Sequence, residues 1–184
     1  MGNKTSNIRS NNTDITNQFS YFPSKDVQDW AISFKKQFPC GYITLTNLEQ
    51  VFKRLFPFGS CKKFVKRLFY TINISQSNQI EFHELLIAFS ILKAGSSFEK
   101  LRWIFRFYDE DSDGVVSKAE MIEIAQSLVD MVSNTLDLNI DAEKAINDLF
   151  EVCENKSGFF TFEDFKELAV RKKEAFEMLT LYIC

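Results

Sequence analysis

The chain has 184 residues, of which 45% are hydrophobic, and a formal net charge of −3. It is long enough for one domain or two small lobes with apolar cores, so a chain that is disordered throughout is excluded. No apolar run approaches the roughly 18 residues of a membrane span, and the start lacks the apolar segment of a secretory signal. The four cysteines include no Cys-x-x-Cys pair, which favours neither a zinc site nor a disulfide framework. A cytoplasmic protein is therefore expected.

The charge is divided unevenly along the chain. Residues 1–95 carry 12 Lys and Arg against 6 Asp and Glu, whereas residues 96–184 carry 10 against 19. A basic front half can face anionic lipid or an acidic partner, and an ordinary solvated helix face is the open alternative. No nucleic-acid partner is expected. The basic residues concerned are Lys53, Arg54, Lys62, Lys63, Lys66 and Arg67.

The first six residues, Met1 to Ser6, match the N-myristoylation pattern, in which Gly2 is exposed once Met1 is removed. The residues up to about Ser20 are polar, rich in Asn, Ser and Thr, and lack periodicity, which favours a flexible arm. One myristoyl chain binds a bilayer only marginally, so basic residues of the front half would supply a second signal. We expect residues 1–22 to be a lipidated arm that makes the protein peripheral on membranes; an ordinary disordered start is the alternative.

Residues 23–95 are predicted to form an N-lobe that begins with a helix–loop–helix unit. Ser24 is expected to cap its first helix. Loop one, residues 36–47, has the glycine and the apolar eighth residue of a calcium loop but none of its ligands, so it is predicted to bind no metal. The pattern Thr46-x-x-Glu49 predicts a capping box at the start of the next helix.

Loop two, residues 73–84, keeps more of the calcium-loop skeleton. Asn78 replaces the usual glycine in a conformation that asparagine tolerates, and Glu84 closes the loop. Affinity in such loops follows the number of carboxylates, and Glu81 and Glu84 are the only charged residues here. The sequence therefore leaves ion binding by loop two open and favours a weak or empty site. Neutral residues stand where aspartates are expected, at Asn73, Ser75 and Ser77.

Loop three, residues 109–120, carries the complete calcium pattern. Ca²⁺ is a hard cation that takes six to eight oxygens, and alternate residues of a curled 12-residue loop point inward together. Gly114 supplies the sharp turn, and apolar residues at helical spacing on both sides indicate an EF-hand rather than a solvated acidic loop. One tight Ca²⁺ site is predicted, which could also take Mg²⁺. The predicted ligands are Asp109, Asp111, Asp113, the carbonyl of Val115, Ser117 and Glu120.

Loop four, residues 153–164, keeps the glycine and the apolar eighth residue, but cysteine stands at its first ligand position. Asp164 is one methylene shorter than the usual glutamate, so it reaches a large ion less easily and suits Mg²⁺ better. We predict that this loop is empty or binds very weakly. Asp141 is expected to cap the helix before it. Residues 96–184 would thus form a C-lobe, which ends in a short amphipathic tail helix.

The four loops form an internal repeat whose twelfth residues stand at 47, 84, 120 and 164. Repeats of this kind pair, and the apolar eighth residues would form a short two-stranded bridge in each pair. The expected pairs are Ile43 with Ile80 and Val116 with Phe160. The predicted fold is therefore all-α, with four EF-hands paired into two lobes, short β-bridges between paired loops, and a C-terminal tail helix.

Several motifs resemble the neuronal calcium sensor family of recoverin-like and frequenin-like EF-hand proteins. They are the proline-containing first loop, the Met-Gly-x-x-x-Ser start, Phe56-Pro57-Phe58-Gly59, and the run from Lys100 to Tyr108. Met131 to Thr135 and the ending from Leu179 to Tyr182 are similar to the frequenin branch. The resemblance implies a non-enzymatic sensor that binds calcium in some of loops two to four and regulates kinases, cyclases or channels, often at membranes. A monomer is expected.

The resemblance also implies a hydrophobic groove in the N-lobe that receives an amphipathic helix of a target protein. The expected lining residues are Trp30, Phe34, Phe52, Phe56, Phe82, Leu85, Leu86 and Phe89. A calcium-responsive regulator is the leading functional hypothesis. The alternative is a constitutive subunit or scaffold in which the bound ion is structural. An enzyme is not expected, because no nucleophile–base pair, phosphate loop or transition-metal cluster is present in the sequence.

Overall fold

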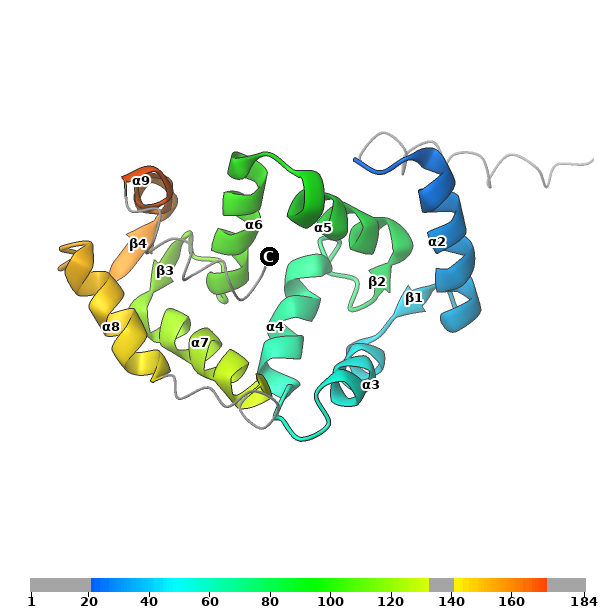
Figure 1. The fold of residues 1–184 in the computed structure, drawn as a ribbon, viewed down its shortest axis with the longest axis horizontal. Helices are drawn as coiled ribbons and strands as arrows, with labels where there is room; N and C mark the ends of the chain where they lie inside the picture. Colours follow the sequence, from blue (N-terminus) through cyan, green and yellow to red (C-terminus); the bar gives the residue numbers. More distant parts are fainter. Residues whose placement is uncertain (1–20, 133–140, 172–184) are drawn as a thin grey trace, which may run out of the picture.

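The computed structural model describes residues 21–132 and 141–171, which form helices and two pairs of short strands (Figure 1). The predicted all-α fold with β-bridges between paired loops is confirmed. The N-terminal half contains α2 (Ser24–Gln37), β1 (Tyr42–Ile43), α3 (Leu45–Leu55), α4 (Lys62–Ile72), β2 (Ile80–Glu81) and α5 (Phe82–Ala94). The C-terminal half contains α6 (Ser97–Tyr108), β3 (Val115–Ser117), α7 (Lys118–Val132), α8 (Ala142–Val152), β4 (Phe159–Thr161) and α9 (Phe162–Arg171).

The two strand pairs join the loops as the sequence predicts. β1 and β2 are antiparallel with Ile43 opposite Ile80, and β3 and β4 are antiparallel with Val116 opposite Phe160. All four side chains are buried. Successive strand residues face opposite sides, so the apolar eighth residue of each loop turns into the helical core. A loop that lacks ion ligands therefore still has a structural role as the partner of its neighbour.

Two of the expected helix caps are placed differently by the structure. Thr44 is the N-cap of α3, because it directly follows β1 and still has an extended backbone. Its hydroxyl oxygen accepts from the N–H of Asn47 at 3.2 Å, and the Asn47 side-chain oxygen accepts from the Thr44 N–H at 3.0 Å. The predicted box of Thr46 and Glu49 is therefore wrong by two residues. Ser24 is already the first residue of α2 and makes no side-chain cap.

The helix α4 lies in the middle of the molecule and packs against helices of both halves (Figure 1). It contacts α3 and α5 on one side and α6 and α7 on the other. The ring centroid of Phe64 in α4 is 5.6 Å from that of Phe107 in α6, and Trp103 stacks on Phe107 at 5.7 Å. Both halves thus contribute to one continuous apolar core. The predicted division into lobes between residues 95 and 96 stays a prediction.

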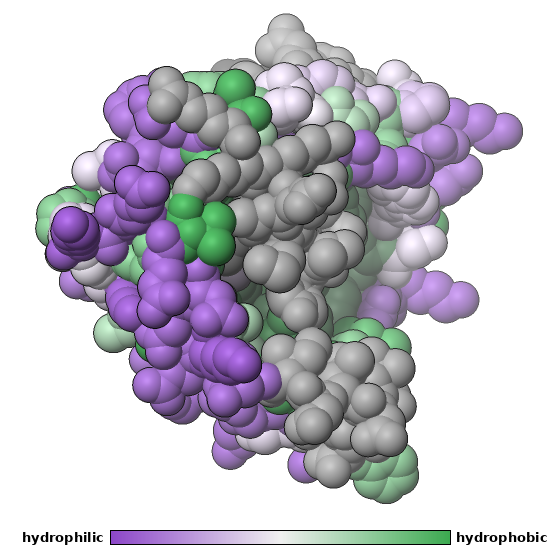
Figure 2. Space-filling view, turned by 60° about the vertical axis from the view of Figure 1, so that its left-hand side comes forward, coloured by the Kyte–Doolittle hydropathy of each residue, from purple (hydrophilic) through white to green (hydrophobic). Residues whose placement is uncertain are grey.

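The side of the molecule that carries α8 and α9 comes forward in Figure 2, where hydrophilic residues cover much of the described surface beside smaller hydrophobic patches. None of the helices in the described ranges is long and apolar enough to cross a membrane. The predicted myristoylation site at Gly2 and the predicted tail helix lie outside the described residues.

Candidate metal centre

Loop three begins where α6 ends and closes at the start of α7. The N–H of Asp109 donates to the carbonyl of Phe105 at 2.9 Å, which completes the last turn of α6. Gly114 has a φ of +88°, in the left-handed region that glycine adopts without strain. This turn returns the chain to β3, after which α7 carries Glu120 back toward the start of the loop. The sequence thus folds the first and last ligand positions toward each other.

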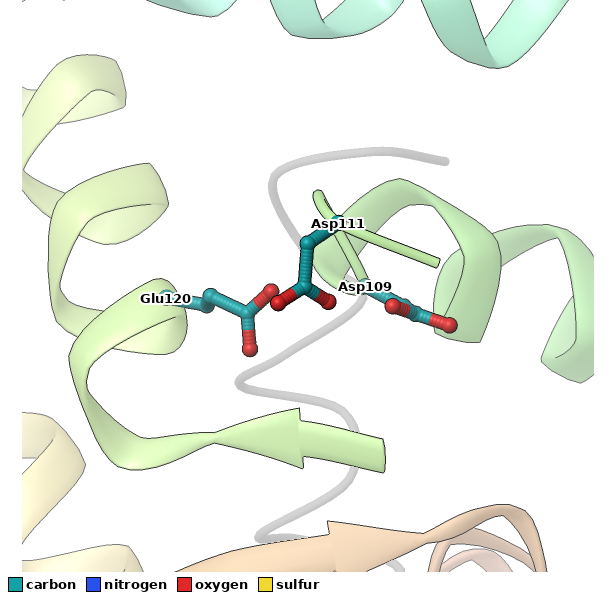
Figure 3. A group of neighbouring side chains, drawn as sticks. All are labelled: Asp109, Asp111 and Glu120. Atoms are coloured by element: carbon teal, nitrogen blue, oxygen red, sulfur yellow. The ribbon is translucent and has the colours of Figure 1, made fainter. Parts of the chain in front are cut away.

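Three carboxylates converge at this point. Asp109, Asp111 and Glu120 each offer an oxygen, and these oxygens all lie within 4.8 Å of one another. Figure 3 shows the carboxylates of Asp111 and Glu120 directed toward each other, with Asp109 beside them at the end of α6. Within residues 21–132 and 141–171, this is the acidic group whose spacing suits a metal ion. An all-oxygen donor set of this kind favours a hard cation such as Ca²⁺ or Mg²⁺.

The side chain of Asp109 is the most deeply placed of the three, with 8% of the residue exposed. Its Oδ2 accepts from the N–H of Gly114 at 3.2 Å, whereas its Oδ1 is buried without a hydrogen-bond partner. Burial raises the pKa of Asp109, and the charges of Asp113 and Glu120 act in the same direction. A buried, unpartnered carboxylate oxygen is unfavourable unless a cation or donor satisfies it. The residues present therefore fit a bound cation.

Glu120 ties the start of α7 to the start of loop three. One of its oxygens accepts from the N–H of Glu110 at 2.9 Å, and the other accepts from the N–H and the hydroxyl of Ser117, both at 2.7 Å. Burial alone would raise the pKa of Glu120, but these bonds and one from the N–H of Asp111 outweigh it and leave the pKa below its usual value. Glu120 is therefore a charged group with both oxygens engaged by the loop.

The remaining predicted ligands surround this cluster without joining it. The carboxylate of Asp113 accepts from the N–H of Val115 at 2.9 Å, so it braces the turn into β3. Ser117 donates its hydroxyl to Glu120 and caps α7. Val115 itself pairs with Thr161 across the bridge to β4. The sequence pattern names all six positions, and the structure brings together the side chains of Asp109, Asp111 and Glu120.

Known proteins resemble this chain along nearly its whole length. It is 32% identical over 185 residues to neuronal calcium sensor 1 of Lymnaea stagnalis, covering 98% of this chain and 97% of that protein. It is 31% identical over 185 residues to neuronal calcium sensor 1 of Aplysia californica, with the same coverage of both chains. The chain belongs to the neuronal calcium sensor family. No protein-family model matches it. The family predicted from the sequence motifs is thus confirmed.

In this family member, hydrogen bonds within loop two engage the oxygens of Glu84 and Asn73, while the buried side-chain nitrogen of Asn73 has no hydrogen-bond partner. Glu84 is 1% exposed, and its two oxygens accept from the N–H groups of Ser75 and Glu81, each at 2.9 Å. The side-chain oxygen of Asn73 accepts from the hydroxyl of Ser75 and the N–H of Ser77, each at 3.2 Å. Asn78 has the left-handed backbone predicted for it, with a φ of +59°. The weak or empty site expected in loop two stays a prediction.

Loop four is closed in a similar way. The side-chain oxygen of Asn155 accepts from Ser157 and from the N–H of Gly158, and Asp164 accepts from the N–H and hydroxyl of Thr161, both at 2.7 Å. The carboxylate of Asp164 thus pairs with the cap residue Thr161 at the start of α9, as Glu120 pairs with Ser117 at the start of α7. Its neighbours at the other ligand positions are neutral, which is why the acidic cluster forms in loop three.

The predicted N-lobe groove corresponds in part to a cavity of about 320 Å³ between α2 and α5. Trp30 and Phe89 are 40% and 49% exposed there. Phe52 and Phe56 do not line it. Phe52 in α3 stacks on Phe56, the residue after that helix, at 6.3 Å, and also packs on Phe64 in α4. Binding of a partner in this cavity stays a prediction. Its lining residues are Trp30, Ser33, Phe34, Gln37, Phe38, Phe82, Leu85, Leu86 and Phe89.

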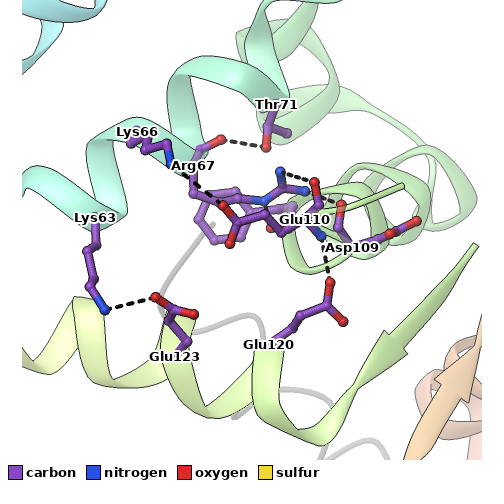
Figure 4. A network of polar contacts seen from close by, with 9 residues as sticks. Lys63, Lys66, Arg67, Thr71, Asp109, Glu110, Glu120 and Glu123 are labelled. Carbon is purple, nitrogen blue, oxygen red and sulfur yellow. Dashed lines mark hydrogen bonds and ion pairs between the residues drawn. The ribbon is translucent and has the colours of Figure 1, made fainter. Parts of the chain in front are cut away.

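Arg67 has a different role in the structure from the one that the sequence indicates. It belongs to the basic residues expected to face anionic lipid, an acidic partner or solvent, but it is buried. Its guanidinium donates to backbone carbonyls around the start of loop three (Figure 4). The spacing along the helix could have indicated this burial. Arg67 follows the buried Phe64 by three residues and precedes the buried Thr71 by four, so the three share one helical face.

The replacement Asp109→Asn is expected to raise the thermal unfolding midpoint of the metal-free protein at neutral pH, while it weakens calcium binding. Because the pKa of Asp109 is raised in the folded state, its charged form opposes folding above the unfolded-state pKa. That cost disappears as pH falls through the raised pKa, so the difference between variant and parent should shrink in acid. Calorimetric unfolding in chelator at several pH values measures it.

The matched control for this prediction is Asp113→Asn, which removes the same charge from an exposed residue of the same loop. It should raise the midpoint by less than Asp109→Asn does, because it relieves only the repulsion that Asp113 exerts on Asp109 and leaves the burial of Asp109 unchanged. Equal midpoints for Asp109→Asn and the parent at neutral pH would contradict the view that Asp109 is held ionised at a cost to the fold.

Proposed function

We propose that this chain is a calcium-responsive regulator that binds Ca²⁺ through loop three. The ligands would be the side chains of Asp109, Asp111, Asp113 and Glu120 with Ser117 and the carbonyl of Val115. The observation that supports the proposal best is the convergence of three carboxylates, one of which, Asp109, has a buried oxygen without a hydrogen-bond partner. Membership of the neuronal calcium sensor family adds independent support.

A bound Ca²⁺ would supply the positive charge that the buried oxygen of Asp109 lacks. Asp109 follows α6 and Glu120 belongs to α7, so a common ligand joins two helices. In the proposed ion-bound state, Glu120 turns both oxygens toward the ion and away from the N–H groups of Glu110 and Ser117, from which it accepts hydrogen bonds here. The proposed response is therefore a change in how α7 and the start of loop three are held relative to each other.

The proposed readout is a hydrophobic groove for one face of an amphipathic helix in a membrane-associated kinase, cyclase or channel. The cavity between α2 and α5 supports it, since aromatic side chains line it and two of them are half-exposed. Aromatic anchors of this kind dominate the affinity of helix-in-groove complexes.

Calorimetric titration with Ca²⁺ tests ion binding, and one strong site per chain is the expected result. A hydrophobic dye added with and without Ca²⁺ tests the response. Increased dye fluorescence with Ca²⁺ supports a sensor, whereas strong binding without any change in dye fluorescence would mean that the ion is structural and the protein a constitutive subunit.

The replacement Gly2→Ala is expected to move the protein from membranes to the soluble fraction of its native cells. We propose that Gly2 is myristoylated and that basic residues of the front half add the second membrane signal. Fractionation of cells measures the shift, and Asn11→Ala serves as a control that leaves Gly2, Ser6 and the basic residues of the arm unchanged. Intact-protein mass spectrometry showing an unmodified terminus in the parent would contradict this proposal.

A further inference from the structure

Arg67 is a buried cation that joins the two halves of the molecule. The residue is 9% exposed and extends from α4 to the end of α6 (Figure 4). Its Nε donates to the carbonyl of Phe107 at 2.5 Å, and its Nη2 donates to the carbonyls of Arg106 and Asp109. Its Nη1 lies 3.5 Å from the carbonyl of Glu110, at the long end for a hydrogen bond. One side chain thus holds the backbone from the last turn of α6 to the second residue of loop three.

These carbonyls explain why a charged side chain is retained in the core. The last carbonyls of a helix have no partner within the helix and carry its negative dipole end, so a cation there is favourable. The planar guanidinium presents five donors and can satisfy several carbonyls at once, which a lysine ammonium cannot do in the same geometry. Arg67 is therefore the C-terminal cap of α6, supplied by a helix of the other half.

The cap and the candidate ion ligands share backbone groups. Asp109 contributes its carboxylate to the acidic cluster and its carbonyl to Arg67. Glu110 donates its N–H to the carboxylate of Glu120 while its carbonyl faces Arg67. A rearrangement of Glu120 that releases the N–H of Glu110 thus acts on a peptide segment that Arg67 holds. The contacts run without a gap from α7 through loop three to α4.

The helix α4 continues this connection toward the cavity between α2 and α5. It packs against α5, which supplies Phe82, Leu85 and Phe89 to the cavity wall. The other ion pairs between α4 and the C-terminal half are exposed, as for Lys63 with Glu123 at 2.8 Å, and exposed pairs of this kind contribute little. Arg67 is the buried polar contact of α4 with loop three in the described part of the chain.

We propose that Arg67 is a positioning residue that couples the state of loop three to the N-terminal half. This inference rests on the proposed function, since it needs calcium at loop three. It explains how one ion site in the C-terminal half controls a groove whose own two loops lack the acidic cluster. Because coupling between sites is reciprocal, a ligand in the groove should also change the calcium affinity of loop three.

The test uses Trp30 as a reporter of the groove. The chain has two tryptophans, and Trp103→Phe keeps an aromatic ring against Phe107, so the full-length parent for this experiment is Trp103→Phe. Calcium is added while heat of binding and Trp30 emission are recorded. Arg67→Lys keeps the positive charge but loses the planar set of donors. Its matched control is Lys63→Met, which removes a cation from the same helix without touching loop three.

Arg67→Lys is expected to lower calcium affinity by about fivefold or more, the lower end of typical coupling between sites. At saturating calcium it should also lose most of the Trp30 response that the parent shows. Lys63→Met should match the parent in both measurements. Arg67→Met, which removes the charge as well, should abolish the Trp30 response; if it does not fold, Arg67→Lys still decides the question.

A full Trp30 response in Arg67→Lys at saturating calcium would overturn the coupling, even if affinity falls, because Arg67 would then be only a helix cap. A parent that binds calcium without any Trp30 response would also overturn the proposed coupling. The proposed binding of calcium by loop three would still stand. A parent that binds no calcium would instead contradict the proposed function, and this inference with it.

Discussion

The replacement Glu120→Gln is expected to lower calcium affinity by about 100-fold or more, which corresponds to about 2.7 kcal/mol of binding free energy. Glutamine has no charge and offers one carbonyl oxygen where glutamate offers two. Glu120 is also the only member of the acidic cluster that α7 contributes, so its loss uncouples that helix from the ion. Isothermal titration calorimetry of parent and variant measures the change.

Asp164→Asn is the matched control, because Asp164 holds the twelfth position of loop four and pairs with the cap residue of α9 in the same manner. This control should leave the tight site unchanged. Two or more tight sites in the unaltered protein, or a tight site that survives in Glu120→Gln, would show that loops two or four carry the binding.

The double replacement Trp30→Ala with Phe89→Ala is expected to weaken binding of an amphipathic helix by well over tenfold. Truncating one central aromatic anchor of an interface costs about 2 kcal/mol or more. Trp30 from α2 and Phe89 from α5 lie on opposite walls of the same cavity. The probe is a labelled synthetic helix of about four turns with leucines on one face, and its fluorescence anisotropy is measured with calcium present.

The matched control is Ile32→Ala with Leu55→Ala, which removes two exposed apolar side chains outside the cavity. It should bind the probe like the parent, and both double variants should keep the calcium affinity of loop three. Undiminished binding in the folded Trp30 and Phe89 variant would exclude this cavity and direct attention to the C-terminal half.

The repeat of loops, their pairing and the ligand pattern of loop three could be predicted because each depends on local residue types at fixed spacing. Ile43, Ile80, Val116 and Phe160 pair as predicted, since one apolar residue at the eighth position of each loop decides the register. The left-handed backbone of Asn78 was also predictable, because few other residues tolerate it.

The features that sequence alone misplaced depend on which groups approach from elsewhere in the fold. Arg67 lies in a basic stretch of the sequence, but the carbonyls that accept its hydrogen bonds belong to a segment about 40 residues further along the chain. Phe52 has the spacing of a groove residue, but it packs instead on Phe64 in α4. Thr44 rather than Thr46 caps α3, because β1 ends one residue before Thr44 and fixes where the helix starts.

The closure of loop one by Thr44 and Asn47 determines which of its residues can be modified without opening the loop. The loop keeps its turn through the backbone of Gly41, with a φ of +87°, and through the pairing of Ile43 with Ile80. Cys40, at the fifth position of the loop, is exposed and takes no part in that closure. A label attached to the thiol of Cys40 would therefore lie in the loop that pairs with loop two, and would leave the groups that hold loop one closed in place.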